Sequence, residues 1–431
     1  MKNIIKKILI SILQNEAKLA LKRHSPFVIA VVGSVGKTST KDAVAAALSP
    51  ALNVRKSKKS YNSDIGIPLT ILGLNNPWSN PFQWILVLFR GLVEIFNKDF
   101  PEILVMEVGA DHPGDISELS SWLKTDIIVA TQFAKVPVHI ENFPSREAVL
   151  QEKLSILKTL KPDGYIIANS DDEEFTEAFK DMNRKAEIYT YGLMPPAYAL
   201  GSSEQFTFDE NDRVNGFTFK IECESNVFPI KVKNVLGDQH KYPILAGFTV
   251  AKVLDINTVL VLDGLSTIKY EPGRMRIIEG VKDSTIIDDS YNSSPIATRR
   301  ALEAFTRVPS TGKKIAILGE MLELGKYGEE EHKKMGGLAA SSSDILVAVG
   351  KFARDTAEGA LVTGMDESYI LQFENAREAG KYVEHLIEKG DLVLIKGSQG
   401  TRMEKAVIEL MAHPEDKEKL LARQEEEWSR R

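Results

Sequence analysis

Short runs of apolar, mostly β-branched residues recur along the first third of the chain, and each is followed by a glycine or a polar residue. They occupy residues 27–32, 103–108 and 127–130, and an alanine-rich stretch with helical spacing follows the first of them at 41–48. Fully apolar runs of this length are typical of strands that are buried on both faces. Strands that alternate with helices form a parallel sheet with helices on both sides, so we expect an α/β domain here.

The pattern changes twice further along the chain. Alternating apolar and polar positions at 200–235 predict antiparallel strands. From residue 285 the α/β pattern resumes with further apolar runs, at 286–289, 315–319, 345–350 and 392–397. We therefore expect a second sheet domain, and we expect the charged tail at 414–431 to form a solvated helix.

Together these patterns predict an α/β fold in three parts. The first is an N-terminal amphipathic helix at 1–25. The second is a central domain at 26–265 with a mostly parallel sheet, and the third is a Rossmann-like α/β domain at 266–431.

The N-terminal segment carries lysines around an apolar stretch but lacks a clear small-residue cleavage site, which argues against a signal peptide. Helical spacing gathers its large apolar side chains on one face: Ile5, Ile8, Leu9, Ile12 and Leu13. Two interpretations remain open. The helix packs on its own domain, or it lies with its basic side chains on an anionic membrane surface.

A second apolar run at 82–97 is too short to span a bilayer and contains Arg90 and Glu94. We interpret it as a buried helix or as a patch that binds a partner. Either interpretation is more consistent with its length and charges than a transmembrane segment.

Composition narrows the class of protein. The chain has 431 residues with 54 basic and 60 acidic side chains, and its formal net charge of −6 excludes a broadly basic nucleic-acid binder. Its 43% hydrophobic and 26% charged residues are typical of globular domains. The single cysteine, Cys223, excludes a disulfide framework and a zinc site built on several thiolates, so we expect a reducing, cytoplasmic setting.

The first apolar run leads into a glycine-containing loop at 33–40 that has the pattern G-x-x-G-K-T and precedes the alanine-rich helix. Such a loop turns its backbone N–H groups toward phosphate at a helix N-terminus. Its lysine reaches the β- and γ-phosphates, and its threonine hydroxyl can ligate Mg²⁺. We therefore predict an ATP site that includes Gly33, Ser34, Gly36, Lys37, Thr38 and Ser39, and we expect the central domain to be a P-loop ATPase domain.

Three further residues are candidates for metal binding or catalysis. Glu107 ends a predicted strand beside Gly109, at the sheet edge where ligands gather. His139 and Lys153 lie fourteen positions apart. Composition alone favours a surface imidazole and a solvated lysine for this last pair.

These motifs, taken in order, resemble those of the Mur ligase family over most of the chain. The matching segments are 33–40, 61–70, 107–116, 272–274, 288–292, 318–325 and 396–398, together with the spacing from His139 to Lys153. The C-terminal segments are the more specific ones, because a phosphate loop alone occurs in many protein classes.

The resemblance implies a reaction and its participants. The family forms amide bonds with ATP through an acyl phosphate, and this branch adds D-alanyl-D-alanine to UDP-N-acetylmuramoyl-tripeptide for peptidoglycan precursors. Closure of the two domains would exclude water from the acyl phosphate. The resemblance further implies a cytoplasmic monomer with small-molecule and peptide substrates and no nucleic acid, and the N-terminal helix leaves open a weak contact with a membrane surface or a partner ligase.

The resemblance also implies roles for individual residues. Lys37, His139 and Lys153 would be catalytic, with Lys153 carbamylated. One Mg²⁺ would bind Thr38 and Glu107, and a second would bind near His139 and Lys153. Asp289 and Asn292 would contact the ribose and adenine of ATP, and Arg274 would belong to the ATP site at the hinge between the domains. Asn62 and Ser63 would contact the substrate.

Departures from the family pattern keep alternatives open. The phosphate loop begins at Gly33, so we expect only a helix where relatives carry a separate UDP-binding domain. Two alternatives to the addition of D-alanyl-D-alanine remain. The chain is a related ligase that joins another amino acid or peptide to a different carboxylate, or it is a non-catalytic ATP-binding scaffold. Folylpolyglutamate synthases share the loop, but residues 288–292 favour the peptidoglycan branch. Amidotransferase-linked relatives add a zinc element that one cysteine cannot build.

Overall fold

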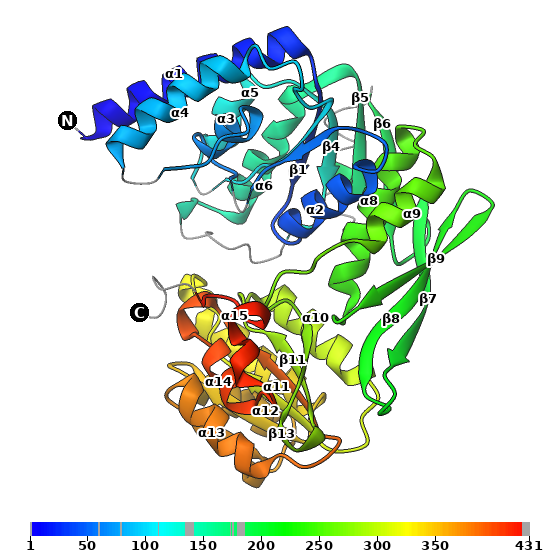
Figure 1. The fold of residues 1–431 in the computed structure, drawn as a ribbon. Coiled ribbons are helices and arrows are strands. Elements are labelled where there is room, and N and C mark those ends of the chain that lie inside the picture. The colour runs from blue at the N-terminus through cyan, green and yellow to red at the C-terminus, as the bar shows by residue number, and fades with distance from the viewer. Residues whose placement is uncertain are drawn as a thin grey trace.

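The computed structural model describes residues 2–58, 61–77, 80–110, 112–133, 142–172, 174, 176–178 and 186–424. It contains two sheets, each with helices on both faces (Figure 1). The central domain, blue to green, carries the larger sheet, and the C-terminal domain, yellow to red, lies beneath it in this view. The α/β class predicted from the apolar runs is confirmed.

Over the described residues the central sheet has nine strands in the order β2-β3-β1-β4-β5-β6-β7-β8-β9. The strands from β2 to β7 are parallel, and β7, β8 and β9 are antiparallel. The strands are β1 Phe27–Val32, β2 Val54–Lys56, β3 Ile103–Glu107, β4 Thr125–Ala130, β5 Leu160–Asn169, β6 Glu187–Gly192, β7 Ala199–Phe208, β8 Val214–Cys223 and β9 Asn226–Lys233. The antiparallel part falls where the alternating pattern at 200–235 predicted it.

Helices cover both faces of this sheet because successive residues of β1 point to opposite sides. Ile29 and Val31 join the core beneath α2, α8 and α9, whereas Val28, Ala30 and Val32 join the core beneath α1, α3 and α5. The helices are α1 Lys2–His24, α2 Lys37–Leu48, α3 Gly66–Ile71, α4 Pro81–Glu94, α5 Asp115–Ser120, α6 Arg146–Leu154, α8 Lys241–Val253 and α9 Thr258–Ser266.

The C-terminal sheet has the order β10-β11-β15-β12-β13-β14. Only β10 is antiparallel among these strands as described, so the sheet is Rossmann-like. Its strands are β10 Arg276–Glu279, β11 Thr285–Asp289, β12 Lys314–Leu318, β13 Ile345–Val349, β14 Ile370–Phe373 and β15 Leu392–Lys396. Its helices are α10 Pro295–Arg307, α11 Gly328–Ala340, α12 Ala353–Val362, α13 Ala376–Leu386, α14 Glu404–Leu410 and α15 Lys417–Leu420. The apolar runs missed β10 and β14, which are four-residue strands at the sheet edges.

The two domains meet along the segment that follows β9. An isolated bridge joins Val235 to Arg276, and the Leu236 amide donates to the Met275 carbonyl at 3.0 Å. On the flank of this junction, the Arg307 guanidinium of α10 lies 2.9 Å from the Asp238 carboxylate. Backbone pairing and this ion pair therefore connect the domains.

The structure corrects part of two predictions about the termini. The first helix does pack on its own domain, but it buries Leu13, Ala17 and Ala20, whereas Ile8 and Ile12 of the predicted apolar face are 55% and 39% exposed. In the tail, Pro414–Asp416 and α15 form short exposed helical turns as predicted, but Leu421 and Ala422, which follow them, are buried. Leu421 packs into the core of the C-terminal domain, so the charged tail does not extend into solvent at this point.

Candidate active site

The phosphate loop joins β1 to α2 and is fixed by the residues that follow β4. The Thr131 hydroxyl donates to the Val35 carbonyl at 2.7 Å, and the Ser34 amide donates to the Gln132 carbonyl at 2.6 Å. A Cβ at Gly33 would lie 2.0 Å from the Thr131 hydroxyl oxygen, so only glycine fits at this position. These contacts attach the phosphate loop to the residues that follow β4.

The loop has the features of an anion site. Gly36 has a φ of 83° and precedes the first turn of α2, whose N-terminal amides are oriented toward the loop. The Lys37 ammonium bends back to the Ser34 carbonyl at 3.4 Å. The Ser34 hydroxyl is buried and has no hydrogen-bond partner among the described residues, as expected for a group that a phosphate oxygen would satisfy.

Thr38 and Glu107, the predicted metal pair, lie together. The Thr38 hydroxyl donates to Glu107 Oε2 at 2.8 Å, and Glu107 is 3% exposed at the end of β3. The strand register pairs Glu107 with Val31, so the carboxylate stands at the sheet edge directly beside the phosphate loop. A hydroxyl and a carboxylate are hard oxygen donors that suit Mg²⁺ when phosphate oxygens and water complete the shell.

Lys153 reaches the same loop from α6. Its Nζ donates to the Gly33 carbonyl at 3.1 Å, and the residue is 5% exposed, so it is not the solvated lysine that composition favoured. The neighbouring Glu152 accepts from the backbone amides of Gly114, Ile116 and Ser117 and thereby anchors the start of α5 against α6. His139, the other residue of the predicted pair, lies outside the described residues.

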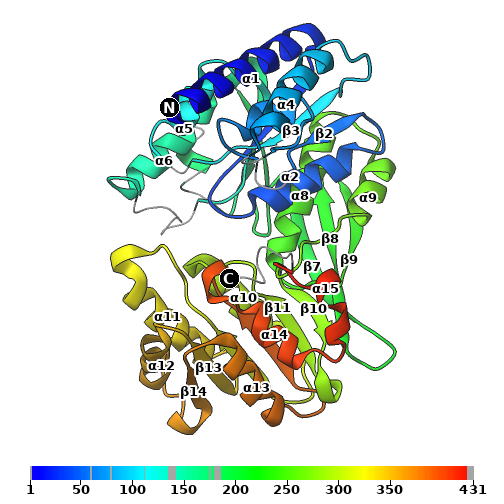
Figure 2. The ribbon, with the colours of Figure 1, turned by 60° about the vertical axis from the view of Figure 1, so that its left-hand side comes forward.

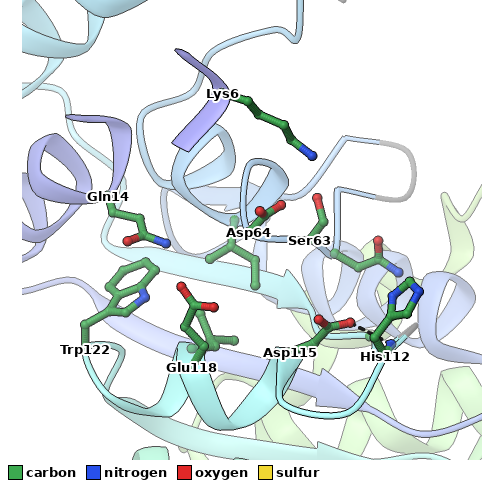
Figure 3. A pocket seen from close by; sticks show the side chains of 12 residues that line it. Lys6, Gln14, Ser63, Asp64, His112, Asp115, Glu118 and Trp122 are labelled. Atoms are coloured by element: carbon green, nitrogen blue, oxygen red, sulfur yellow. Dashed lines mark hydrogen bonds between the residues drawn. The ribbon is translucent and has the colours of Figure 1, made fainter. Parts of the chain in front are cut away.

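Asn62 and Ser63 lie near Gly109, two residues after Glu107. The Asn62 amide occupies the space beside Gly109, where a Cβ would lie 2.5 Å from Nδ2. Both residues line a cavity of about 310 Å³ between α1 and α5 (Figure 3). The predicted substrate residues therefore border a cavity whose wall includes Gly109, two residues after Glu107.

The same cavity contains residues that the sequence did not single out. Figure 3 shows Lys6 of α1 above it, Gln14 of α1 at its left, and three carboxylates around it, those of Asp64, Asp115 and Glu118. Asp115 accepts from the His112 amide at 2.9 Å, which orders the turn before α5. In the sequence, the turn before α5 was noted only as part of the matching segment 107–116. No sequence pattern predicted that the first helix would lie on the opposite side of the same cavity.

The predicted nucleotide contacts on the C-terminal domain also cluster. Asp289 ends β11 opposite Lys396 of β15, and the two side chains form a buried ion pair of 2.6 Å. The Lys396 ammonium also donates to the Asn292 carbonyl at 3.0 Å. Burial raises the pKa of Asp289, although the Lys396 ammonium opposes that rise. Its neighbour Asp288 is buried too, and desolvation raises the pKa of Asp288 to about 6.

Arg274 lies at the junction of the domains and stacks on this cluster. Its guanidinium carbon is 4.4 Å from the centroid of the Tyr291 ring, and Arg423 from the tail is 5.2 Å from the same centroid. The Arg274 carbonyl is 3.0 Å from His240 Nε2, and burial lowers the pKa of His240 to about 4, so the neutral ring donates this bond. Tyr291 and Lys396 lie in the sequence motifs 288–292 and 396–398 but were given no role there, and Arg423 lies in none of the motifs.

This arrangement of a phosphate loop, a buried glutamate beside it and a second α/β domain agrees with comparisons to known families. The Mur ligase middle domain matches residues 31–251, and the Mur ligase, glutamate ligase domain matches residues 273–399. The chain belongs to the Mur ligase family.

Individual relatives narrow the similarity within the family. The chain is 29% identical over 404 residues to the UDP-N-acetylmuramoyl-tripeptide–D-alanyl-D-alanine ligase of Bacillus subtilis (strain 168), covering 93% of this chain and 79% of the relative. Among solved structures, MurF ligase from Thermotoga maritima in complex with ADP has a TM-score of 0.73 at 25% identity, covering 92% of this chain and 82% of that one. MurF from Acinetobacter baumannii has the same TM-score at 22% identity, covering 93% and 79%.

Proposed function

We propose that this chain joins D-alanyl-D-alanine to UDP-N-acetylmuramoyl-tripeptide with the hydrolysis of ATP to ADP and phosphate. The similar protein of Bacillus subtilis is named for the ligation of these two substrates, and the similar structure from Thermotoga maritima is a complex with ADP. The observation that carries the proposal is the convergence of Thr38, Glu107 and Lys153 on one phosphate loop, beside a cavity lined by Asn62. A site that only held nucleotide would not need a substrate cavity at this edge.

In the first step a carboxylate oxygen of the tripeptide attacks the γ-phosphorus of ATP, and the bond to the β–γ bridging oxygen breaks. Both reactants are anions, so the step depends on neutralisation and alignment. Lys37 and the amides at the start of α2 would bind the phosphate chain. Mg²⁺ held by Thr38 and Glu107 would supply further neutralisation of that charge. Asn62 would align the tripeptide.

In the second step the amino group of D-alanyl-D-alanine attacks the acyl carbon, loses a proton, and expels phosphate. Water competes with this amine, so the cavity must be closed when the acyl phosphate is present. Arg274 lies at the domain junction, where a change in domain orientation would move Asp289 and Asn292 toward the triphosphate. We propose that this pair binds the ribose and adenine of ATP.

We also propose that Lys153 works as a carbamate. Its Nζ already donates to the Gly33 carbonyl, and a carbamate keeps one N–H for that bond while it presents two oxygens to a metal. The protein labelled with ¹³C-bicarbonate should show a carbamate carbon resonance that Lys153→Ala lacks. The absence of this resonance from the active native protein would contradict the carbamate.

The same variant separates binding from chemistry. Lys153→Ala should abolish amide formation and leave ATP affinity within a few-fold, because Lys37 and the backbone amides of the loop remain. Calorimetry with a non-hydrolysable ATP analogue and product mass measure the two effects. Undiminished ligation by the variant would remove Lys153 from the mechanism.

The acyl phosphate itself is tested with oxygen isotopes. A tripeptide whose reacting carboxylate carries ¹⁸O should transfer one ¹⁸O to the released phosphate, since that oxygen stays bonded to phosphorus when the amine attacks carbon. Unlabelled phosphate accompanied by amide product would contradict the proposed intermediate. We expect the active species to be a monomer. Its sedimentation coefficient, measured during turnover, tests this expectation.

A further inference from the structure

Helix α4 is apolar on nearly all sides, yet only one side is covered. Val87 of the helix and Ile95, which follows its last residue, face the domain and are buried. The opposite side is an exposed stripe with helical spacing that continues past the helix end to Phe96 and comprises Phe82, Ile85, Leu86, Phe89, Leu92, Val93 and Phe96. Phe82 is 81% exposed and Ile85 68%. A helix that is apolar all round is normally buried on all sides, so a second surface is expected to cover this stripe.

Helix α1 lies beside α4 and extends the stripe. A Cβ at Gly91 would lie 2.1 Å from the Glu16 carboxylate, and the Arg23 guanidinium stacks 4.8 Å from the centroid of the Phe96 ring. The later residue of α1 contacts the later residue of the α4 segment, so the two helices run parallel. Ile8, Ile12 and Leu19 of α1 are 55%, 39% and 53% exposed.

The charges around this surface are almost all basic. Lys6 lines the cavity between α1 and α5, and Lys18 lies over Trp122 of the same cavity. The other exposed charged side chains described on α1 are Lys7, Lys22 and Arg23, and the helix's only acid, Glu16, is buried. On α4 the exposed charge is Arg90, whereas Glu94 is bound by Arg55 at 2.5 Å. The whole chain, in contrast, has a net charge of −6. The apolar surface is therefore flanked by basic side chains, although the chain as a whole is acidic.

We propose that the outer face of α1 and α4 binds the surface of an anionic lipid bilayer. Such a surface offers hydrocarbon for the stripe and phosphate for the lysines and arginines. The contact would be peripheral, because no helix in the described part of the chain is long and apolar enough to cross a membrane. Both ribbon views place α1 and α4 at the end of the central domain away from the C-terminal domain (Figure 2). A bilayer there would leave the phosphate loop and the domain junction accessible.

The test measures co-sedimentation of the full chain with large vesicles, either of phosphatidylcholine alone or with one third phosphatidylglycerol. We expect binding to the anionic vesicles, at least tenfold weaker binding to neutral ones, and release by high salt. The variant Phe82→Gln/Ile85→Gln/Phe89→Gln should weaken binding to the anionic vesicles at least tenfold. Since these side chains are exposed, the variant should keep its fold, which circular dichroism verifies.

Two matched controls isolate the face. Met194→Gln/Val259→Gln/Val362→Gln removes exposed apolar side chains elsewhere, of which Val362 is 84% exposed, and should bind vesicles as the native chain does. Lys7→Gln/Lys22→Gln/Arg90→Gln should weaken binding to anionic vesicles, whereas Lys389→Gln/Lys417→Gln/Lys419→Gln should not.

Two results would overturn the proposal. One is equal retention of the native chain and the α4 variant by anionic vesicles. The other is no vesicle binding together with a concentration-dependent dimer that the α4 variant abolishes, which would assign the surface to a second copy.

Discussion

Replacing Lys396 by methionine should destabilise the C-terminal domain strongly, because it leaves a buried carboxylate without its cation. The ammonium lies 2.6 Å from Asp289 Oδ2 and 3.0 Å from the Asn292 carbonyl. The Lys396 and Asp289 side chains are only 2% and 12% exposed. In the variant Asp289 keeps one described hydrogen bond, from the Met275 amide at 3.1 Å.

The expected loss is about 3–5 kcal/mol in the free energy of unfolding, the usual cost of removing one partner of a buried ion pair. Methionine has a similar length and leaves little cavity, so the electrostatic cost dominates. Removing the charge of Asp289 as well should recover part of the loss, and Lys396→Met/Asp289→Asn should therefore be more stable than Lys396→Met.

The destabilisation should also depend on pH. Without Lys396 the folded-state pKa of Asp289 rises further above its unfolded value, since burial is then less opposed. A carboxyl whose folded pKa is raised disfavours folding once pH exceeds its unfolded pKa. The gap in stability between native chain and variant should therefore widen from pH 5 to pH 8.

Urea unfolding followed by circular dichroism at several pH values measures these effects for the native chain, the single variant and the double variant. A loss below about 1 kcal/mol at pH 8, or a double variant less stable than Lys396→Met, would refute the argument. It would show that water or another cation reaches Asp289.

Three further predictions follow from contacts near the first domain's ligand-binding edge and its outer helices. Thr38→Val removes the hydroxyl that donates to Glu107 and should raise the Mg²⁺ concentration for half-maximal rate at least about tenfold, measured by metal titration; an unchanged requirement would argue against the metal pair. Gly33→Ala places a Cβ against the Thr131 hydroxyl and should cost about 1–3 kcal/mol of stability, measured by urea unfolding, with no such loss if the loop relaxes freely. Burial raises the pKa of Glu16 to about 7, so its ionisation disfavours folding as pH rises through 7. Glu16→Gln should gain about 3 kcal/mol relative to the native chain between pH 4.5 and pH 8.5, and parallel pH profiles in thermal unfolding would contradict this.

The phosphate loop was predictable because its signal is local. Strand, glycine turn, lysine and helix follow one another between Phe27 and Leu48, and the physical reason for each residue type applies within a few positions. Glu107 could be placed at the same sheet edge because parallel strands share a carboxyl end. Its hydrogen bond to Thr38 follows from that register.

The remaining parts of the site depend on tertiary contacts that no local pattern encodes. Lys396 and Asp289 lie 107 positions apart, and Arg423 reaches Tyr291 from a tail whose composition indicated solvent exposure. Lys6 reaches the cavity only because alanines let α1 pack closely. The roles of Asp289, Asn292 and Arg274, and the place of His139, stay predictions.

The proposed function requires the chain to form an amide between two specific substrates while it converts ATP to ADP and phosphate. The most direct test measures phosphate release with UDP-N-acetylmuramoyl-tripeptide and ATP, with and without D-alanyl-D-alanine, and determines the product mass. We predict phosphate release only when both substrates are present, one phosphate per pentapeptide formed. Background release with both substrates, from a protein that still binds ATP, would contradict the assigned substrates and direct the search to other carboxylates and amines.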